Sequence, residues 1–248
     1  MINTYIWVLV LAFISGLTTI IGVVAAFYFK KNNKGIVAGI GFAIGIMLLV
    51  SFFELIPESI NSAGTIMTLT AVIFGMLLIV FLDFLIPESC FTHSKGTFDK
   101  HLLKAAYCVA FCLILHDFPE GFAMATSFIH SPKMGLLLAL AIAIHNIPEE
   151  FAMAVPLIAA GKGKKFLLKV GLISGLAEPA GAVLGLLMVS FLPKLNPLFM
   201  SFAAGAMIFV SIHELWPMAR KYKNTHIFIT GLVLSAVVYF SLLVLLPE

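Results

Sequence analysis

The chain has 248 residues, of which 61% are hydrophobic and only 11% are charged, and its formal net charge is +3. A soluble globular domain has about 25% charged residues. The mean hydropathy of +1.11 therefore excludes a soluble fold, a disordered chain and a nucleic-acid-binding protein. The composition predicts an all-α polytopic membrane protein.

Apolar runs long enough to cross a bilayer as helices follow one another along the whole chain. We expect a single transmembrane domain, residues 1–248, with no room for a soluble domain. The first run lacks the basic flank and the cleavage site of a signal peptide, so we expect it to be retained. The eight expected spans are 5–29, 36–60, 64–88, 105–129, 134–160, 166–192, 197–219 and 226–246.

The basic residues predict the orientation of these spans. Apart from Lys133 and Lys194, every Lys and Arg falls in a loop, or at a helix end, of one side. Cytoplasmic loops carry the excess of Lys and Arg, so this side is expected to face the cytoplasm and both termini to lie outside it. The expected location is the plasma (inner cell) membrane, with the lipid bilayer as a partner.

The acidic residues, in contrast, fall inside the expected spans. A carboxylate within a membrane needs a counter-charge, a proton or a metal. No Lys or Arg is expected there, so these groups are predicted to await a metal cation or protons. They are Glu54, Asp83, Asp117, Glu120, Glu149, Glu150, Glu178 and Glu214.

Two copies of one motif carry the chemistry: HDFPE at 116–120 in the fourth span and HNIPE at 145–149 in the fifth. In each copy the His and the Glu are four residues apart and share a helical face. The proline lacks an N–H and frees a backbone carbonyl. The two spans are expected to be antiparallel, so the motifs meet near the membrane midplane as an inverted repeat, which is typical of transporters.

A third carboxylate, Glu178, stands beside Pro179 at a similar depth in the sixth span. Imidazole and carboxylate ligands together suit Zn²⁺, Fe²⁺ or Mn²⁺. An oxygen cage for Mg²⁺ or Ca²⁺ would not need two histidines.

A second internal similarity relates the sequence ELIP at 54–57 to ELWP at 214–217. It predicts Glu54 near the outer mouth, and His213 with Glu214 near the cytoplasmic mouth. Asp83 is expected toward the inner side. Polar residues that simply end a helix at the membrane interface are the alternative for these positions. The loop between the third and fourth spans, with His93, either holds metal loosely or is an ordinary solvated loop.

The paired motifs, together with AEP at 177–179 and HELWP at 213–217, resemble the ZIP (Zrt/Irt-like) metal transporters, most closely the bacterial ZupT/GufA-like branch. The resemblance covers nearly the whole chain. It implies eight helices in a 3+2+3 inverted-repeat arrangement with the fourth and fifth central, and a two-metal centre. One metal site would use His116, Glu120, His145 and Glu149, with Met47 nearby. The other would use Asp117, Asn146 and Glu178, with Glu120 and Glu149 bridging.

The resemblance also implies a function. Family members move divalent transition metals into the cytoplasm, with zinc first and iron, manganese or cadmium as further cargo. The protein would then not be an enzyme, and the metal would be its substrate rather than a cofactor. Many relatives form dimers, so a homodimer is an open alternative to a monomer.

Three positions depart from the family pattern. Asp117 stands where Asn is frequent, which adds a charge to the second site. His145 stands where some relatives have Gln, which should strengthen the first site. Glu150 replaces the usual Gly, and it either extends the second site or faces another helix as a protonated acid.

An intramembrane metal-dependent hydrolase is the alternative function. The H-x-x-P-E spacing differs from the H-E-x-x-H of zinc proteases, and no general base is set apart from the ligands. A proton- or sodium-coupled carrier of an organic solute would usually have a basic residue or a wide polar cavity in the membrane. A duplicated site on antiparallel helices favours metal transport over both.

Overall fold

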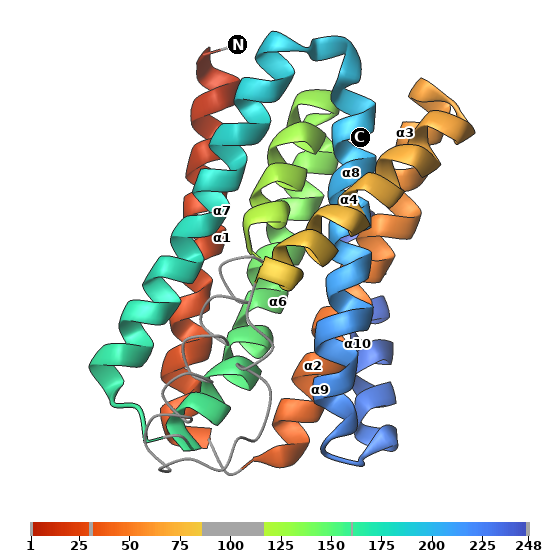
Figure 1. Ribbon diagram of the computed structural model, residues 1–248. Helices are drawn as coiled ribbons and strands as arrows, with labels where there is room; N and C mark the ends of the chain where they lie inside the picture. Colours follow the sequence, from red (N-terminus) through yellow and green to blue (C-terminus); the bar gives the residue numbers. More distant parts are fainter. Residues whose placement is uncertain (1, 30–31, 86–116, 160, 247–248) are drawn as a thin grey trace.

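The computed structural model describes residues 2–29, 32–85, 117–159 and 161–246, and the regular elements in these ranges are helices. They form an antiparallel bundle in which α1 begins, and α10 ends, at the same end of the molecule (Figure 1). Two turns are π-helical, η1 (Ser51–Leu55) and η4 (Ser211–Leu215), and η3 (Pro193–Leu195) is a 3₁₀ turn. Residues 117–130 are helical as well. The other α-helices are α1 (Ile2–Phe29), α2 (Asn33–Val50), α3 (Ile56–Ala63), α4 (Thr65–Leu85), α6 (Pro132–Ala159), α7 (Lys164–Phe191), α8 (Asn196–Val210), α9 (Trp216–Arg220) and α10 (Thr225–Leu245).

Seven helical stretches in the described ranges are long and apolar enough to cross a membrane. The remaining expected span, 105–129, is helical over the part that the structure describes, from residue 117 onward. The prediction of an all-α polytopic membrane protein is confirmed, and the protein is a multi-pass membrane protein. The apolar outer surface of the bundle faces lipid, which removes the need for a polar coat.

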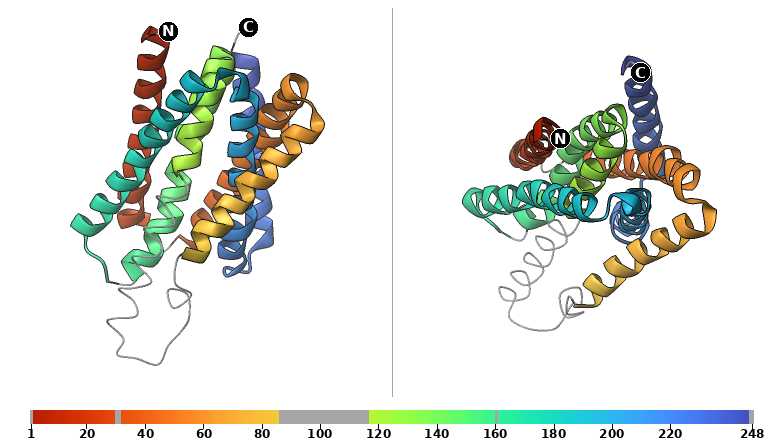
Figure 2. Two further views of the ribbon diagram at one scale, coloured as in Figure 1. Left: turned by 45° about the horizontal axis from the view of Figure 1, so that its top comes forward. Right: turned by 90° about the horizontal axis from the view of Figure 1, so that it is seen from above.

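Helix pairing follows an inverted repeat. On one side of the bundle α2 packs against α10, and on the other side α8 packs against α4. If the first three spans are exchanged with the last three, α1 takes the place of α7, α2 that of α8, and α4 that of α10. The α2–α10 pair then becomes the α8–α4 pair, and the α1–α7 contact is unchanged. Helix α6 lies between α1 and α2 and contacts both. Figure 2 shows the same grouping from two further directions.

Two expected spans are not single α-helices. The second continues from α2 through η1 into α3 and reaches Ala63, and the seventh continues from α8 through η4 into α9. The sequences ELIP and ELWP each begin inside a π-helical turn, and the helix continues past both, as the expected spans 36–60 and 197–219 predict. A π-helical turn carries one extra residue and frequently marks a functional site.

The helices around α7 approach one another very closely at two glycines. A Cβ atom on Gly121 would lie 1.9 Å from the carbonyl oxygen of Glu178, and one on Gly175 would lie 2.2 Å from that of Gly16. Any larger residue would push the backbones apart. These contacts hold α1, α7 and the helix at 117–130 together around the acidic side chains of the core.

Candidate metal centre

Glu120 from the helix at 117–130, with His145 and Glu149 from α6, forms a cluster whose ligand atoms all lie within 4.8 Å of one another. The Nε2 atom of His145 is 3.0 Å from Oε1 of Glu120 and 3.6 Å from Oε2 of Glu149. All three side chains are buried. The four-residue spacing of His145 and Glu149 puts both on one face of α6, and the antiparallel neighbouring helix adds Glu120.

The imidazole of His145 is oriented by the backbone of its own helix. Its Nδ1 lies 2.9 Å from the carbonyl oxygen of Ala141. A carbonyl only accepts hydrogen bonds, so Nδ1 carries a hydrogen and donates it. Metal-binding histidines commonly donate one ring N–H in this way and bind through the other nitrogen. The arrangement leaves Nε2, the atom that faces both carboxylates, as the nitrogen able to bind a cation.

Two buried carboxylate oxygens, one in the cluster and one on α7, increase the demand for a cation. Within the described part of the chain, Oε2 of Glu120 and Oε2 of Glu178 have no hydrogen-bond partner, and both side chains are fully buried. Buried polar atoms without a partner are costly, and buried charges are normally paired or bound to metal. None of the buried charged side chains described is Lys or Arg. A proton or a metal cation is therefore the available means of balance.

A polar network adjoins the cluster and involves four helices. Asn146 donates a hydrogen bond to Oε1 of Glu178, and its Nδ2 lies 3.4 Å from the carbonyl oxygen of Ser15 on α1. The hydroxyl of Ser174 on α7 contacts both Asp117 and Glu150, the latter at 2.8 Å. A hydroxyl has one hydrogen to donate. Both contacts are satisfied when one of the two carboxyl groups carries a proton.

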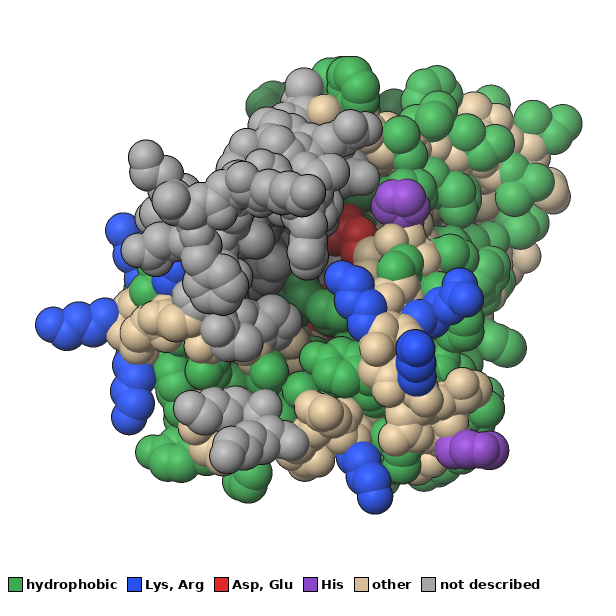
Figure 3. All heavy atoms as spheres, turned by 60° about the horizontal axis from the view of Figure 1, so that its bottom comes forward, with side chains coloured by type: hydrophobic (Ala, Val, Ile, Leu, Met, Phe, Trp, Pro, Cys, Tyr) green, Lys and Arg blue, Asp and Glu red, His purple; other side chains and the backbone are tan. Residues whose placement is uncertain are grey.

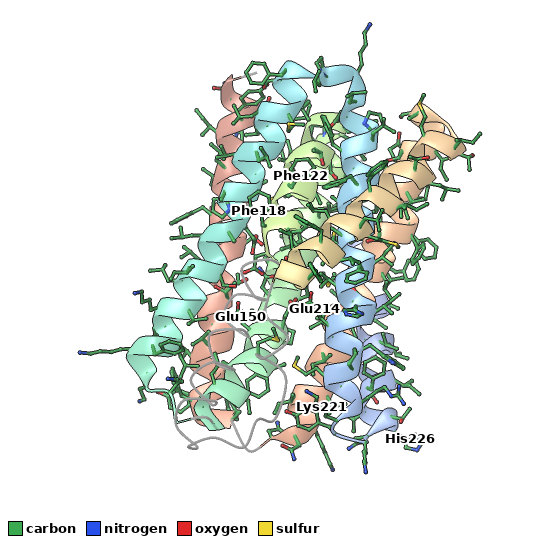
Figure 4. All side chains as sticks on the ribbon, viewed as in Figure 1. Phe118, Phe122, Glu150, Glu214, Lys221 and His226 are labelled. Atoms are coloured by element: carbon green, nitrogen blue, oxygen red, sulfur yellow. The ribbon has the colours of Figure 1, made fainter. Side chains whose placement is uncertain are left out.

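The structure thus brings together most of the residues expected at the midplane. Glu120, His145 and Glu149 lie in one group, and Asp117, Asn146 and Glu178 lie in the adjoining network with Glu150. His116 lies outside the described residues, as do the loop histidines. In Figure 4, Glu150 lies within the bundle, well away from Lys221 and His226 at the bottom.

The other expected site residues lie away from this group or carry other contacts. Met47 is buried in α2, and its sulfur lies 3.4 Å from the hydroxyl of Ser211 in η4. Glu54 in η1 accepts a hydrogen bond of 2.7 Å from Tyr239. His213 stacks on Phe209 with ring centroids 4.7 Å apart.

Glu214 lies in η4, and Figure 4 shows it at about the height of Glu150 rather than at the end of the bundle. Asp83 falls near the end of α4, and its side chain is outside the described part of the structure.

Two polar residues of the network were not predicted from the sequence. Ser174 stands four residues before Glu178 on α7, so the helical spacing offered a signal for it. Ser15 contributes its backbone carbonyl, for which the sequence holds no signal. The role of Ser174 depends on the rotation of α7 against α6, which only the tertiary packing fixes.

Fold and side chains together define a multi-pass membrane protein with a buried imidazole–carboxylate cluster on an inverted repeat. Residues 92–244 match the family model described as "ZIP Zinc transporter". The chain is 36% identical to the zinc transporter ZupT of Corynebacterium aurimucosum, over 90% of this chain and 91% of that one. It is 35% identical to that of Lysinibacillus sphaericus, over 95% and 96%, and 36% identical to that of Chlorobium limicola, over 98% and 99%. The chain therefore belongs to the ZIP family, in its ZupT branch.

Proposed function

We propose that this protein carries divalent transition-metal cations, zinc foremost, across the plasma membrane into the cytoplasm. The observation that carries the proposal is the buried group of Glu120, His145 and Glu149, with ligand atoms within 4.8 Å of one another. Relatives at 35–36% identity are named zinc transporters. Iron, manganese and cadmium are proposed as further substrates, because the same imidazole and carboxylate ligands also bind these metals.

The ligand set suits a first zinc site. Zinc prefers four ligands of nitrogen, oxygen or sulfur in a tetrahedron. Glu120, His145 and Glu149 offer three, and His116, one helical turn before Glu120, is proposed as the fourth, with Met47 nearby. The second site would use Asp117, Asn146 and Glu178, and Glu120 and Glu149 would bridge the two metals. In this proposal Glu150 belongs to the second site.

The pathway beyond the centre would run past the acidic π-helical turns. Glu54 would serve the outer side, and His213 with Glu214 the cytoplasmic side, to which Asp83 also belongs. Both termini would lie outside the cytoplasm. Figure 3 shows the opposite end of the molecule, where Lys and Arg side chains are spread over the face and acidic side-chain atoms are visible deeper in. This distribution supports a cytoplasmic location for that end.

We infer that the protein is a transporter rather than an enzyme, with metal as its substrate and no cofactor. A metal-dependent hydrolase needs a general base apart from the metal ligands. The carboxylates described near His145 are themselves the proposed ligands, so a hydrolase is not favoured. A homodimer remains part of the proposal by resemblance to the family.

The test is zinc uptake into liposomes that contain purified protein and a zinc-sensitive dye. Glu120→Ala and Glu149→Ala should each abolish uptake, because each removes a carboxylate from both proposed sites. Ile144→Leu is the matched control, since Ile144 neighbours His145 on α6 but is 37% exposed rather than buried in the cluster. Near-normal uptake by both glutamate variants, at normal expression, would show that metal does not pass through this cluster.

A further inference from the structure

A second group of metal-binding side chain types lines a cavity at the outer end of the bundle. The cavity has a volume of about 310 Å³, and its wall includes Glu54, Glu58, His130 and Lys133. Four elements meet there: the stretch from η1 to α3, the end of the helix at 117–130, the start of α6, and α10. This group is separate from the buried cluster, and the function proposed above assigns nothing to Glu58 or His130.

Two of these side chains already contact each other. The Nε2 atom of His130 is 2.8 Å from Oε1 of Glu58, and the two side chains are 25% and 38% exposed. They come from residues far apart in the sequence, on helices that the fold brings side by side. The pair is therefore an imidazole and a carboxylate that face one another at the border of a water-accessible space.

Glu54 is held at the same cavity by a fixed hydrogen bond. Tyr239 on α10 donates to Oε1 of Glu54 at 2.7 Å, and Tyr239 is fully buried. A buried tyrosine ring has little freedom to turn away, so the phenol keeps the carboxylate in place. The other carboxylate oxygen, Oε2, stays available for a further contact. Tyr239 thus acts as a positioning residue for Glu54.

The distance between Nε2 of His130 and Oε1 of Glu58 suits a divalent cation after a small adjustment. Ligand atoms on a tetrahedral zinc at about 2.1 Å stand roughly 3.4 Å apart. The 2.8 Å pair of Glu58 and His130 would need to open by about half an ångström, which partly exposed side chains can do by small rotations. The cavity leaves room for water molecules as the remaining ligands.

Lys133 limits how tightly such a site can bind. Its ammonium group belongs to the same wall as the two carboxylates and repels an incoming dication. The site would therefore hold a cation weakly and release it readily. Weak binding suits a position that collects metal from the outside and passes it on.

We propose that Glu58 and His130, on the wall of the cavity that Glu54 also lines, form a weak outer site for a divalent transition metal, from which the cation moves on to the buried cluster. The proposal of metal binding at this site is supported by the cavity and by the side chains that line it. Its role in loading rests on the proposed transport function.

The first test measures binding of Cd²⁺ alone to the purified full-length protein by equilibrium dialysis. Glu120→Ala and Glu149→Ala are introduced first, so that the buried cluster no longer contributes. Adding His130→Ala or Glu58→Gln should then remove one weak class of site or weaken it at least about tenfold; loss of outer-shell partners alone commonly costs 10- to 100-fold in affinity. Lys133→Gln should tighten binding. His226→Ala, an exposed histidine at the other end, should change nothing.

The second test does not depend on the buried ligands. In a chain whose cysteines Cys90, Cys108 and Cys112 are replaced by serine, His130→Cys is labelled by an impermeant thiol reagent. Cd²⁺ should slow this labelling, and adding Glu58→Gln should cancel the protection. Unchanged Cd²⁺ binding in the first test, or labelling that Cd²⁺ never slows, would mean that Glu58 and His130 are a structural ion pair only.

The loading role is tested by zinc transport kinetics. Glu58→Gln should raise KM several-fold and leave kcat nearly unchanged, whereas Glu120→Ala abolishes transport. An unchanged KM would overturn the loading role. If the unmodified protein transports no metal, the proposed function fails, but the two Cd²⁺ measurements still decide whether the outer site exists.

Discussion

The closeness of the backbones at Gly121 makes a sharp prediction about the metal centre. Gly121 follows Glu120 directly, and a Cβ atom there would lie 1.9 Å from the carbonyl oxygen, 2.6 Å from the carbonyl carbon and 2.8 Å from the Cα of Glu178. All three are backbone atoms, so no side-chain rotation can relieve the clash. In Gly121→Ala the two helices must move apart by about 1.5 Å to reach ordinary van der Waals contact.

This shift separates Glu120 from Glu178, and Asp117 from Ser174. Misplacement of reacting groups by about 1 Å can cost 100-fold in rate, and binding groups face a comparable constraint. We expect Gly121→Ala to lower zinc transport about 100-fold and to weaken Cd²⁺ binding at the cluster. Overpacking should also cost about 1–3 kcal/mol of stability.

Gly75→Ala is the control that separates lost stability from lost geometry. A Cβ on Gly75 would lie 1.9 Å from the carbonyl oxygen of Phe202, so the clash is equal, but it falls between α4 and α8. Thermal unfolding and Cd²⁺ binding are measured for both variants. Both should be destabilised, and Gly121→Ala alone should lose metal affinity. Equal loss of affinity in both, or wild-type transport by Gly121→Ala, would refute the reasoning.

Three other outcomes are expected. In a chain freed of native cysteines, Ser131→Cys should react with an impermeant thiol reagent on intact cells and Gly163→Cys should not; the reverse pattern would invert the orientation. His145→Gln should lower zinc affinity more than manganese affinity, because a hard amide oxygen replaces the imidazole nitrogen, and equal losses in a binding titration would contradict this. Zinc affinity should fall as the pH is lowered from about 7.5 to 5.5, because protons compete for the ligands and metal binding releases them. A zinc affinity that does not change with pH, with no protons released in weak buffer, would argue against competition between protons and zinc for the ligands.

The helices and the buried cluster could be predicted from the sequence because both depend on the order and spacing of nearby residues. Long apolar runs can satisfy their backbone in lipid only as helices, and His145 with Glu149 share a face through their spacing alone. The duplication of the motif on antiparallel spans then predicts that Glu120 approaches His145, which it does at 3.0 Å.

The π-helical turns were missed because an uninterrupted apolar pattern gives no sign of one extra residue. Pro57 and Pro217 were a signal, since each stands two residues after its π-helical turn. Proline has no N–H for the carbonyl four residues earlier. The carbonyls at that distance belong to Phe53 and His213, which both lie inside the π-helical turns. Both expected spans already continued past these prolines, and only the extra residue of each π-helical turn was not foreseen.

The outer cavity could not be predicted because it joins helices that are far apart in the sequence. Glu58 and His130 meet only because α3 and the end of the helix at 117–130 are neighbours in the fold. Contacts of this kind depend on helix rotation and tilt, which the composition of a membrane span leaves open.

Charge balance connects the buried cluster to a transport cycle. A net charge deep in a membrane costs several kcal/mol, and no Lys or Arg is among the buried charged side chains described. Glu120 and Glu149 together carry two negative charges when ionised, which a dication at His145 neutralises. Without metal, protons must take over this role, and the contacts of Ser174 with Asp117 and Glu150 can accommodate one. We therefore expect the loaded and the empty centre both to approach neutrality, with protons on the buried carboxyl groups that the cation does not bind, and exchange of the cation for protons would then alternate between the two states.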